Sequence, residues 1–223
     1  MVRFPQSVGD KGSQKWIQKL INKKPELLNM QIRRNLNLPE DEEIRWLSPL
    51  EDDEYAEYRD QDFINLLGVK LEKIPLVNFW PERGPQWDAL GKSHSGKLFL
   101  VEAKSHIQEL ISTLQAKDED SVRKIHKSLE ETKRFLNSNA EIDWSHRFYQ
   151  YTNRLAHLYL LRRNQLPAYL VFVYFVNDLE MKGPTTVYEW EGAIKLLHSY
   201  LGIGRHKLKN FVADVFIDIN YLE

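Results

Sequence analysis

The spacing of apolar and polar residues near the middle of the chain predicts two strands joined by a hairpin. Residues 86–90 and 98–104 are rich in strand-forming side chains, and residues 91–96 between them are polar and bounded by glycine. In the second run, successive side chains point to opposite faces of the predicted sheet. One face carries Leu98, Leu100, Glu102 and Lys104, and the other carries Phe99, Val101 and Ala103.

Helical and strand-like periods alternate along the rest of the chain. Apolar residues recur at helical spacing in several segments, and the segment at 54–68 ends in a glycine that suits a helix terminus. The predicted helices lie near residues 13–21, 27–36, 54–68, 107–111, 122–135, 144–161 and 189–201, and further strands lie within 69–80 and at 168–176 and 211–219. This alternation predicts the α/β class, with a mixed central β-sheet flanked by helices.

The chain divides most simply near residue 50. Residues 51–223 contain the predicted strands and form one α/β domain, whereas residues 1–50 contain predicted helices and form an N-terminal helical extension. The sequence leaves three roles open for this extension. It is a clamp on a substrate, a dimer contact or a cover over a hydrophobic edge.

Composition is that of a chain with one buried core, and it excludes several classes of protein. Of the 223 residues, 42% are hydrophobic and 28% are charged. Because there is no cysteine, the chain has no disulfide, no thiol nucleophile and no zinc–thiolate site. We find neither a leader of the secretory type nor an apolar run long enough to span a bilayer, so we expect a cytoplasmic protein without membrane association.

Three charged side chains meet at the predicted hairpin. Asp88 lies in its first strand, and Glu102 and Lys104 share a face at the end of its second strand. Carboxylates on neighbouring strands can share a hard divalent cation such as Mg²⁺ or Mn²⁺, and an ammonium group beside them can orient or activate an attacking water. Charges at the end of a strand fit for burial are unfavourable unless paired or metal-bound, so their position indicates a functional site. The alternative is a set of ordinary surface ion pairs at strand ends.

This arrangement resembles the PD-(D/E)XK, or restriction-endonuclease-like, nuclease superfamily. The core of that superfamily is a helix, a three-strand meander carrying Asp and Glu-x-Lys, a helix and a further strand, and the predicted elements here follow that order. The whole chain, including residues 14–16, 46–49 and 80–88, is also similar to a bacterial family of standalone proteins within the superfamily. One departure is that Trp87, and not proline, precedes Asp88.

The resemblance implies a metal site formed by Asp88, Glu102 and an acid from the first helix. Glu57 occupies the matching position, about three helical turns before the glycine that ends the predicted helix. Three neighbouring acids are alternatives, and a solvated acidic helix face is the other interpretation of them. They are Glu54, Asp60 and Asp62.

Polar residues on the predicted helix at 144–161 are candidates for substrate binding. Gln150, Asn153 and Arg154 lie at spacings that place them near one face, where Arg154 could grip a phosphate. An alternative of equal weight is that they make structural hydrogen bonds beside the core. His106 is a further candidate for contact with the scissile phosphate, although a histidine at a helix start is more often an exposed polar residue.

The overall charge does not by itself favour a nucleic-acid partner. A formal net charge of −1 and a pI near 6.7 give no general attraction to a polyanion. A nuclease of this composition therefore needs basic groups gathered on one face. Candidate basic segments are 11–24, 33–34, 162–163 and 205–209, each of which is also typical of a solvated surface.

Together these observations predict a Mg²⁺-dependent phosphodiesterase that acts on nucleic acid, with DNA favoured by the resemblance alone. Many restriction-like nucleases act as dimers, so a homodimer is considered, although the sequence reveals no interface. Two other functions stay open. One is a non-catalytic nucleic-acid or protein-binding module on a nuclease-like fold, and the other is a hydrolase of smaller phosphoesters.

Overall fold

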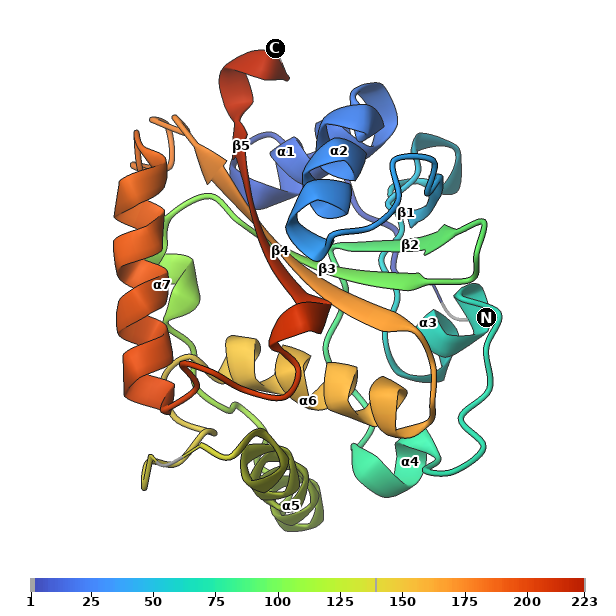
Figure 1. Cartoon of the computed structure of the whole chain (residues 1–223), viewed down its shortest axis with the longest axis vertical. Helices are drawn as coiled ribbons and strands as arrows, with labels where there is room; N and C mark the ends of the chain where they lie inside the picture. The colour runs from blue at the N-terminus through green and yellow to red at the C-terminus, as the bar shows by residue number, and fades with distance from the viewer. Residues whose placement is uncertain (1–2, 139, 223) are drawn as a thin grey trace.

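The computed structural model describes residues 3–138 and 140–222, which contain one five-stranded mixed sheet. Its strands lie side by side in chain order: β1 (Ile44–Ser48), β2 (Ala89–Ser93), β3 (Leu98–Lys104), β4 (Ala168–Val176) and β5 (Val212–Asp218). β2 is antiparallel to both β1 and β3, whereas β3, β4 and β5 are mutually parallel. The predicted α/β class with a mixed central sheet is confirmed (Figure 1).

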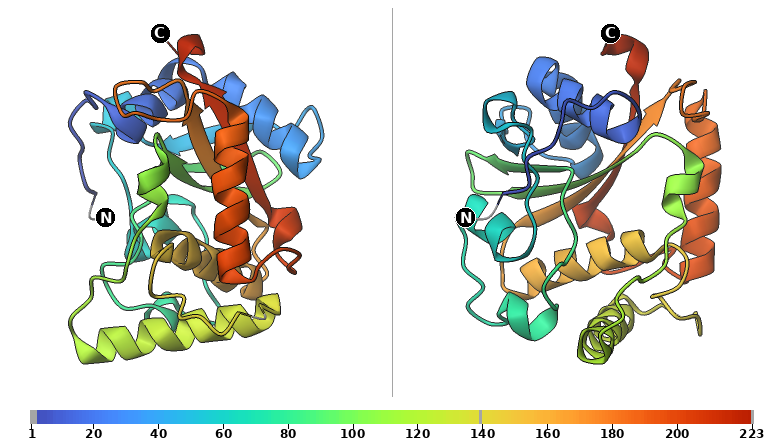
Figure 2. Two further views of the ribbon diagram at one scale, coloured as in Figure 1. Left: turned by 90° about the vertical axis from the view of Figure 1, so that its left-hand side faces the viewer. Right: turned by 180° about the vertical axis from the view of Figure 1, so that it is seen from behind.

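Helices cover both faces of the sheet (Figures 1 and 2). α1 (Gly12–Lys23) and α2 (Pro25–Leu36) lie on one face. On the other face lies α6 (Tyr149–Arg163), against which α5 (Glu119–Leu136) packs. The remaining helices are α3 (Asp60–Leu66), α4 (Leu76–Phe79), α7 (Val187–Leu201) and the 3-10 turns η1 (Glu51–Asp53), η2 (Ile107–Leu110), η3 (Lys209–Phe211) and η4 (Ile219–Tyr221). Within the described residues, no helix is both long and apolar enough to cross a membrane.

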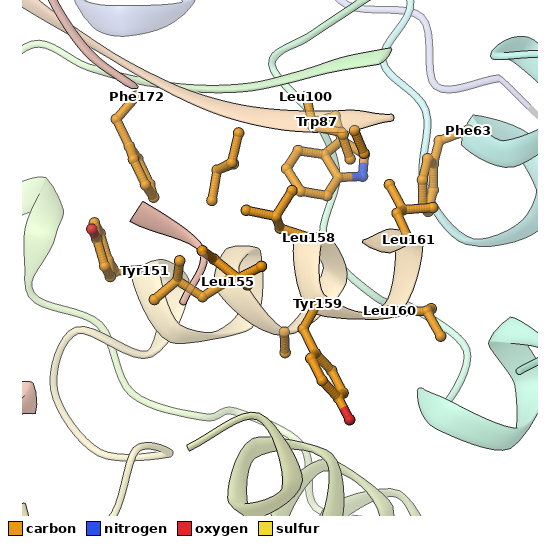
Figure 3. Packing of buried hydrophobic residues seen from close by; sticks show 14 of the residues in the cluster. Phe63, Trp87, Leu100, Tyr151, Leu155, Leu158, Tyr159, Leu160, Leu161 and Phe172 are labelled. Carbon is orange, nitrogen blue, oxygen red and sulfur yellow. The ribbon is translucent and has the colours of Figure 1, made fainter. Parts of the chain in front are cut away.

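The two faces of β3 bury different side chains, as the two-residue period predicts. Leu98 and Leu100 belong to the core that includes α6, while the odd-numbered side chains of β3 belong to the core that includes α1 and α2. Figure 3 shows the first of these cores, where Leu155 and Leu158 of α6 lie beneath the sheet. Glu102 and Lys104 therefore end a strand face that is otherwise covered by apolar side chains.

Most predicted elements of the C-terminal half are confirmed. The central strand β4 has the predicted bounds, and α5, α7 and β5 begin and end within a few residues of the expected positions. The helix predicted at 144–161 begins only at Tyr149. Arg147 and Phe148 have φ values of 46° and 34°, and this left-handed backbone cannot continue into a right-handed helix.

The helix predicted at 54–68 is wrong at its start, because α3 begins at Asp60. Glu54 has a φ of 52°, and Glu57 forms an isolated antiparallel bridge with Phe4. Glu57 is therefore held in an extended segment ahead of the helix and not on the helix itself.

The strand predicted within residues 69–80 is also wrong, since this segment contains α4. The first strand of the sheet is instead β1, which lies in the segment predicted as a purely helical extension. Trp46 of β1 pairs with Gly91 of β2, where a Cβ atom would approach the indole ring to 3.0 Å, so glycine makes room for tryptophan. The N-terminal segment thus contributes an edge strand as well as two helices.

Candidate active site

The hairpin brings the predicted acids together at one end of β3. The first strand of the hairpin is predicted at 86–90, but β2 begins only at Ala89, so Asp88 directly precedes the strand. Asp88 Oδ2 accepts a hydrogen bond of 2.6 Å from the backbone amide of Ala103. Ala103 lies between Glu102 and Lys104 in β3. The side chains of Glu102 and Lys104 share one face of the strand, and the side chain of Ala103 points to the other face. The proximity of Asp88 to the Glu-x-Lys pair, predicted from the hairpin, is therefore present in the structure.

Glu102 is buried between two cations. Lys104 Nζ lies 2.6 Å from Glu102 Oε1, and Arg154 Nε donates to Glu102 Oε2 at 2.6 Å. Burial alone would raise the pKa of Glu102, but the charges of Arg154 and Lys104 outweigh it and lower the pKa. Glu102 is thus held ionised, at 2% exposure, by neighbours on its own strand and on α6.

Arg154 contacts several protein groups. Besides its bonds to Glu102, it donates from Nη2 to the Gln86 carbonyl at 2.8 Å and from Nη1 to Asn153 Oδ1 at 2.9 Å. Its guanidinium lies over the ring of Trp87, 4.8 Å from the centroid. Arg154 and Asn153 do lie beside the acids, as their spacing predicted, but the contacts that they make are internal.

Glu57 is the member of the acidic group 54–62 that lines the same cleft as Asp88 and Glu102. Its Oε2 accepts from Gln86 Nε2 at 2.6 Å. Burial raises the pKa of Glu57, Gln86 opposes this shift, and the charge of Glu102 adds to it. Two of the alternative acids are used elsewhere, since Glu54 pairs with Arg3, and Asp60 accepts from the backbone amides of residues 83 and 84. The third, Asp62, is not among the residues that line the cleft.

Lys104 is oriented from two sides. Nζ contacts Glu102 and also donates to Gln150 Oε1 at 3.0 Å, while the backbone amide of Gln150 donates to Ser112 Oγ at 2.8 Å. Burial would lower the pKa of Lys104, but the charges of Glu102 and Asp88 outweigh it and raise the pKa. Lys104 is therefore a charged donor at neutral pH and not a proton acceptor.

His106 is not among the residues that line the cleft. Its Nδ1 lies 3.1 Å from Gln108 Oε1, and its Nε2 lies 3.7 Å from Glu109 Oε1. These neighbours all belong to the turn that follows β3. The structure therefore places this sequence candidate away from Asp88 and Glu102.

The acids and Lys104 line a single cleft with a volume of about 1330 Å³. One wall is the loop at 80–86, and the other is the extended segment at 111–118. Sequence reasoning missed Gln86, Ser112 and the whole second wall. The apolar residues of segment 111–118 follow neither a helical nor a strand period. Gln86 contacts Glu57, which is 29 residues away in the sequence, so no local pattern indicates this contact.

The donor set suits a hard divalent cation only in part. Asp88 and Glu57 each have one oxygen to which no described residue donates a hydrogen bond, and carboxylate oxygens are the ligands that Mg²⁺ prefers. Both oxygens of Glu102, in contrast, are occupied by Lys104 and Arg154. Across residues 3–138 and 140–222, no group of three or more His, Cys, Asp or Glu side chains is arranged to hold a metal ion.

Asp88→Asn is expected to raise the melting temperature of the metal-free protein at neutral pH. Burial raises the pKa of Asp88 well above 3.8, and the charges of Glu102 and Glu57 raise it further, so the folded state binds this proton more tightly than the unfolded state. Stability is therefore lost as the pH rises from the ordinary pKa through the raised one, and asparagine removes that loss.

Thermal denaturation in a chelating buffer, from about pH 4 to pH 8, measures this effect. The melting temperature of Asp88→Asn should exceed that of wild type by a margin that grows as the pH rises. A suitable control is Asp118→Asn, because a hydrogen bond with Ser121 lowers the pKa of Asp118 and predicts the opposite sign. Equal melting temperatures for wild type and Asp88→Asn across the range would contradict the electrostatic account of the cleft.

The site is thus a cleft with an acidic pair, Asp88 and Glu57, beside an ion-paired triad of Glu102, Lys104 and Arg154. Glu57 and Asp88 come from different segments, and so do Arg154 and Glu102, whereas Glu102 and Lys104 lie two residues apart on β3. In comparisons with protein-family models, with curated proteins and with solved structures, the chain matched none.

Proposed function

We propose that this protein is a metal-dependent nuclease that hydrolyses phosphodiester bonds in nucleic acid, with DNA as the favoured substrate. The observation that carries the proposal is the bond from the Ala103 amide to Asp88, which places that carboxylate beside Glu102 and Lys104 in one open cleft. Two adjacent carboxylates and an oriented ammonium are the groups that metal-assisted phosphodiester hydrolysis needs.

The arrangement of strands supports a restriction-endonuclease-like core as part of this proposal. β1, β2 and β3 form the meander expected of that core, Glu102 and Lys104 lie on its third strand, and β4 follows after helices. The position of α3 departs from the pattern, because it lies between β1 and β2 and not ahead of the meander. The expected acid, Glu57, accordingly comes from the segment after β1.

In the proposed reaction, each residue has a distinct role. Asp88 and Glu57 would hold Mg²⁺ or Mn²⁺ through their free oxygens, and Glu102 would join them once it exchanges a contact with Lys104 or Arg154. The ion would supply charge neutralisation at the phosphate and a lowered pKa for a water molecule. Lys104, kept charged and aimed by Gln150, donates a hydrogen bond to the attacking water or to a phosphate oxygen.

Arg154 supports the site indirectly. It holds Glu102 in place and lies over the ring of Trp87, so most of its donors already have protein acceptors. Gln86 has a similar supporting role, because it joins Glu57 to Arg154 through its side chain and its carbonyl. We therefore assign positioning roles to Arg154 and Gln86 in the proposed enzyme.

Cleavage assays test the proposal directly. Wild type should cut at least one member of a labelled panel of duplex, single-stranded, branched and RNA substrates in Mg²⁺ or Mn²⁺, and Asp88→Asn should not. Calorimetry should show weaker Mn²⁺ binding for Asp88→Asn than for wild type. Asp62→Asn is the matched control, because Asp62 is a nearby acid that does not line the cleft. A folded wild type that binds Mn²⁺ and cuts nothing would refute the nuclease.

A second candidate function is a non-catalytic binding module, and one observation favours it. The ion pairs of Glu102 with Lys104 and Arg154 are complete without any ligand. Such a module predicts no Mn²⁺ isotherm for wild type, which separates it from the nuclease. A hydrolase of small phosphoesters is less favoured, because a cleft of about 1330 Å³ exceeds the range of about 300–1,000 Å³ typical of small-molecule pockets.

A further inference from the structure

A buried carboxyl group lies behind the candidate active site, outside the cleft. Asp178 follows β4 and is 1% exposed. Its Oδ2 accepts from Trp16 Nε1 at 2.8 Å and from Ser105 Oγ at 2.7 Å. No lysine, arginine or histidine of the described residues forms an ion pair with it. A buried carboxyl group without a counter-charge depends on hydrogen-bond donors, which here are Trp16 and Ser105 at Oδ2 and the Met181 amide, 3.4 Å from Oδ1.

The two donors to Asp178 lie on α1 and directly after β3, the strand that carries Lys104. Trp16 belongs to α1, which packs against β3, and Ser105 is the residue directly after Lys104. Through Oδ2, the carboxyl group therefore joins the N-terminal helix to the end of the strand that carries the catalytic lysine.

A second contact from α1 reaches the same residue. The Ser105 amide donates to Glu109 Oε2 at 2.6 Å, and Glu109 Oε1 accepts from Ser13 Oγ at 3.3 Å. Ser105 is fully buried. Its amide and its hydroxyl are thus both held, and each of these bonds leads to α1 through a carboxyl group.

The loop after β4 closes around Ser105 as well. The carbonyl of Asp178 accepts from the Gly183 amide at 2.9 Å. A Cβ atom at Gly183 would lie 2.2 Å from the Ser105 carbonyl oxygen, so only glycine permits this approach. The backbone that follows Lys104 is therefore fixed by three separate segments.

We propose that Asp178 is a positioning residue for Lys104, and that α1 acts through it as a brace for the active-site strand. This inference rests on the proposed nuclease function. It gives α1 a role beyond covering the sheet, and Ser13 of the same helix also lines the cleft. Ser105 transmits the constraint, because a shift of its backbone moves Lys104 away from Gln150 and Glu102.

The chain offers a matched control for the test. Trp46 on β1 donates its indole N–H to Asn29 Oδ1 at 3.0 Å, a buried bond between strand and helix on the same face of the sheet. Trp16→Phe and Trp46→Phe each remove one indole donor from a buried acceptor, and each should lower stability. Only Trp16 is connected to Ser105.

The experiment compares both variants with wild type in steady-state cleavage and in hydrogen exchange of residues 104–106. Trp16→Phe should lower kcat by about 10–100-fold with KM unchanged and should speed exchange at these amides, whereas Trp46→Phe should do neither. Asp178→Asn, which keeps an acceptor oxygen for both donors, should retain most of the wild-type kcat. Ser105→Ala serves as the second test if Trp16→Phe does not fold.

Equal losses of kcat in the two tryptophan variants, or no loss in either, would overturn the brace. Failure of the nuclease proposal is distinguishable, because the exchange measurement needs no substrate. If wild type cuts no nucleic acid, faster exchange at residues 104–106 in Trp16→Phe alone still supports the brace, and equal exchange in all three proteins overturns it.

Discussion

In the proposed nuclease, Lys104→Ala is expected to reduce phosphodiester cleavage by about 10²–10⁴-fold while the protein stays folded. Nζ of Lys104 is the cation that Gln150 aims within the cleft, and alanine removes the donor without replacing it. The fold should survive because Glu102 keeps its bonds to Arg154. Cleavage rates at saturating substrate, with circular dichroism to check the fold, measure the effect.

Lys97→Ala is the matched control for this prediction. Lys97 Nζ lies 2.6 Å from Glu42 Oε2, and Glu42 is as buried as Glu102, but the pair lies at the hairpin turn away from the cleft. Its loss should change stability without changing the cleavage rate. If Lys104→Ala cleaved at the wild-type rate, or if Lys97→Ala lost as much activity, the assigned role of Lys104 would be wrong.

Local periodicity explains why much of the fold could be predicted. The alternation along β3 fixes which side chains face α6, and the apolar run of β4 has the length of a strand and is too short to span a bilayer. β1 was not predicted, because a strand of five residues carries little periodic signal. The start of α3 was misplaced because Glu54 adopts a left-handed conformation that helix propensity does not register.

Some residues of the candidate site could be predicted from the sequence, and others could not. Asp88, Glu102 and Lys104 could be placed together because a hairpin relates them, and turn chemistry is readable from sequence. The pairing of Glu102 with Arg154 joins residues on β3 and α6, so it depends on how the helix packs under the sheet. Gln86 and Ser112 act through equally distant contacts, and no residue pattern marks them.

The electrostatics of the cleft separate two kinds of carboxylate. Burial and the charge of Glu102 raise the pKa of Asp88 and of Glu57 by more than the nearby charges of Lys104 and Arg154, respectively, lower it. Glu102 has two positive partners and a lowered pKa. A cation entering the cleft would therefore gain most from Asp88 and Glu57, while Glu102 already stabilises the folded protein.

Glu102→Met is consequently expected to lower the free energy of unfolding by about 3–5 kcal/mol, because it leaves Arg154 buried without a counter-charge. Arg154 is 4% exposed, and water cannot replace the lost carboxylate there. Arg154→Met should cost less, since Lys104 still pairs with Glu102. Unfolding in urea, followed by tryptophan fluorescence, gives the free energies.

The double variant Glu102→Met/Arg154→Met shows whether the ion pair stabilises the folded protein or whether stability is lost only when one partner is left unpaired. Removing both charges eliminates the unpaired guanidinium, so the double variant should be more stable than Glu102→Met alone. Glu42→Met provides the contrast, because its partner Lys97 is 23% exposed and stays hydrated, and its cost should be smaller. If the losses in the free energy of unfolding from Glu102→Met and Arg154→Met simply add in the double variant, Glu102 and Arg154 do not interact.

If the double variant instead regains stability relative to Glu102→Met, the fold tolerates an apolar pair at these two positions. Function would then be the reason for two buried charges next to Lys104.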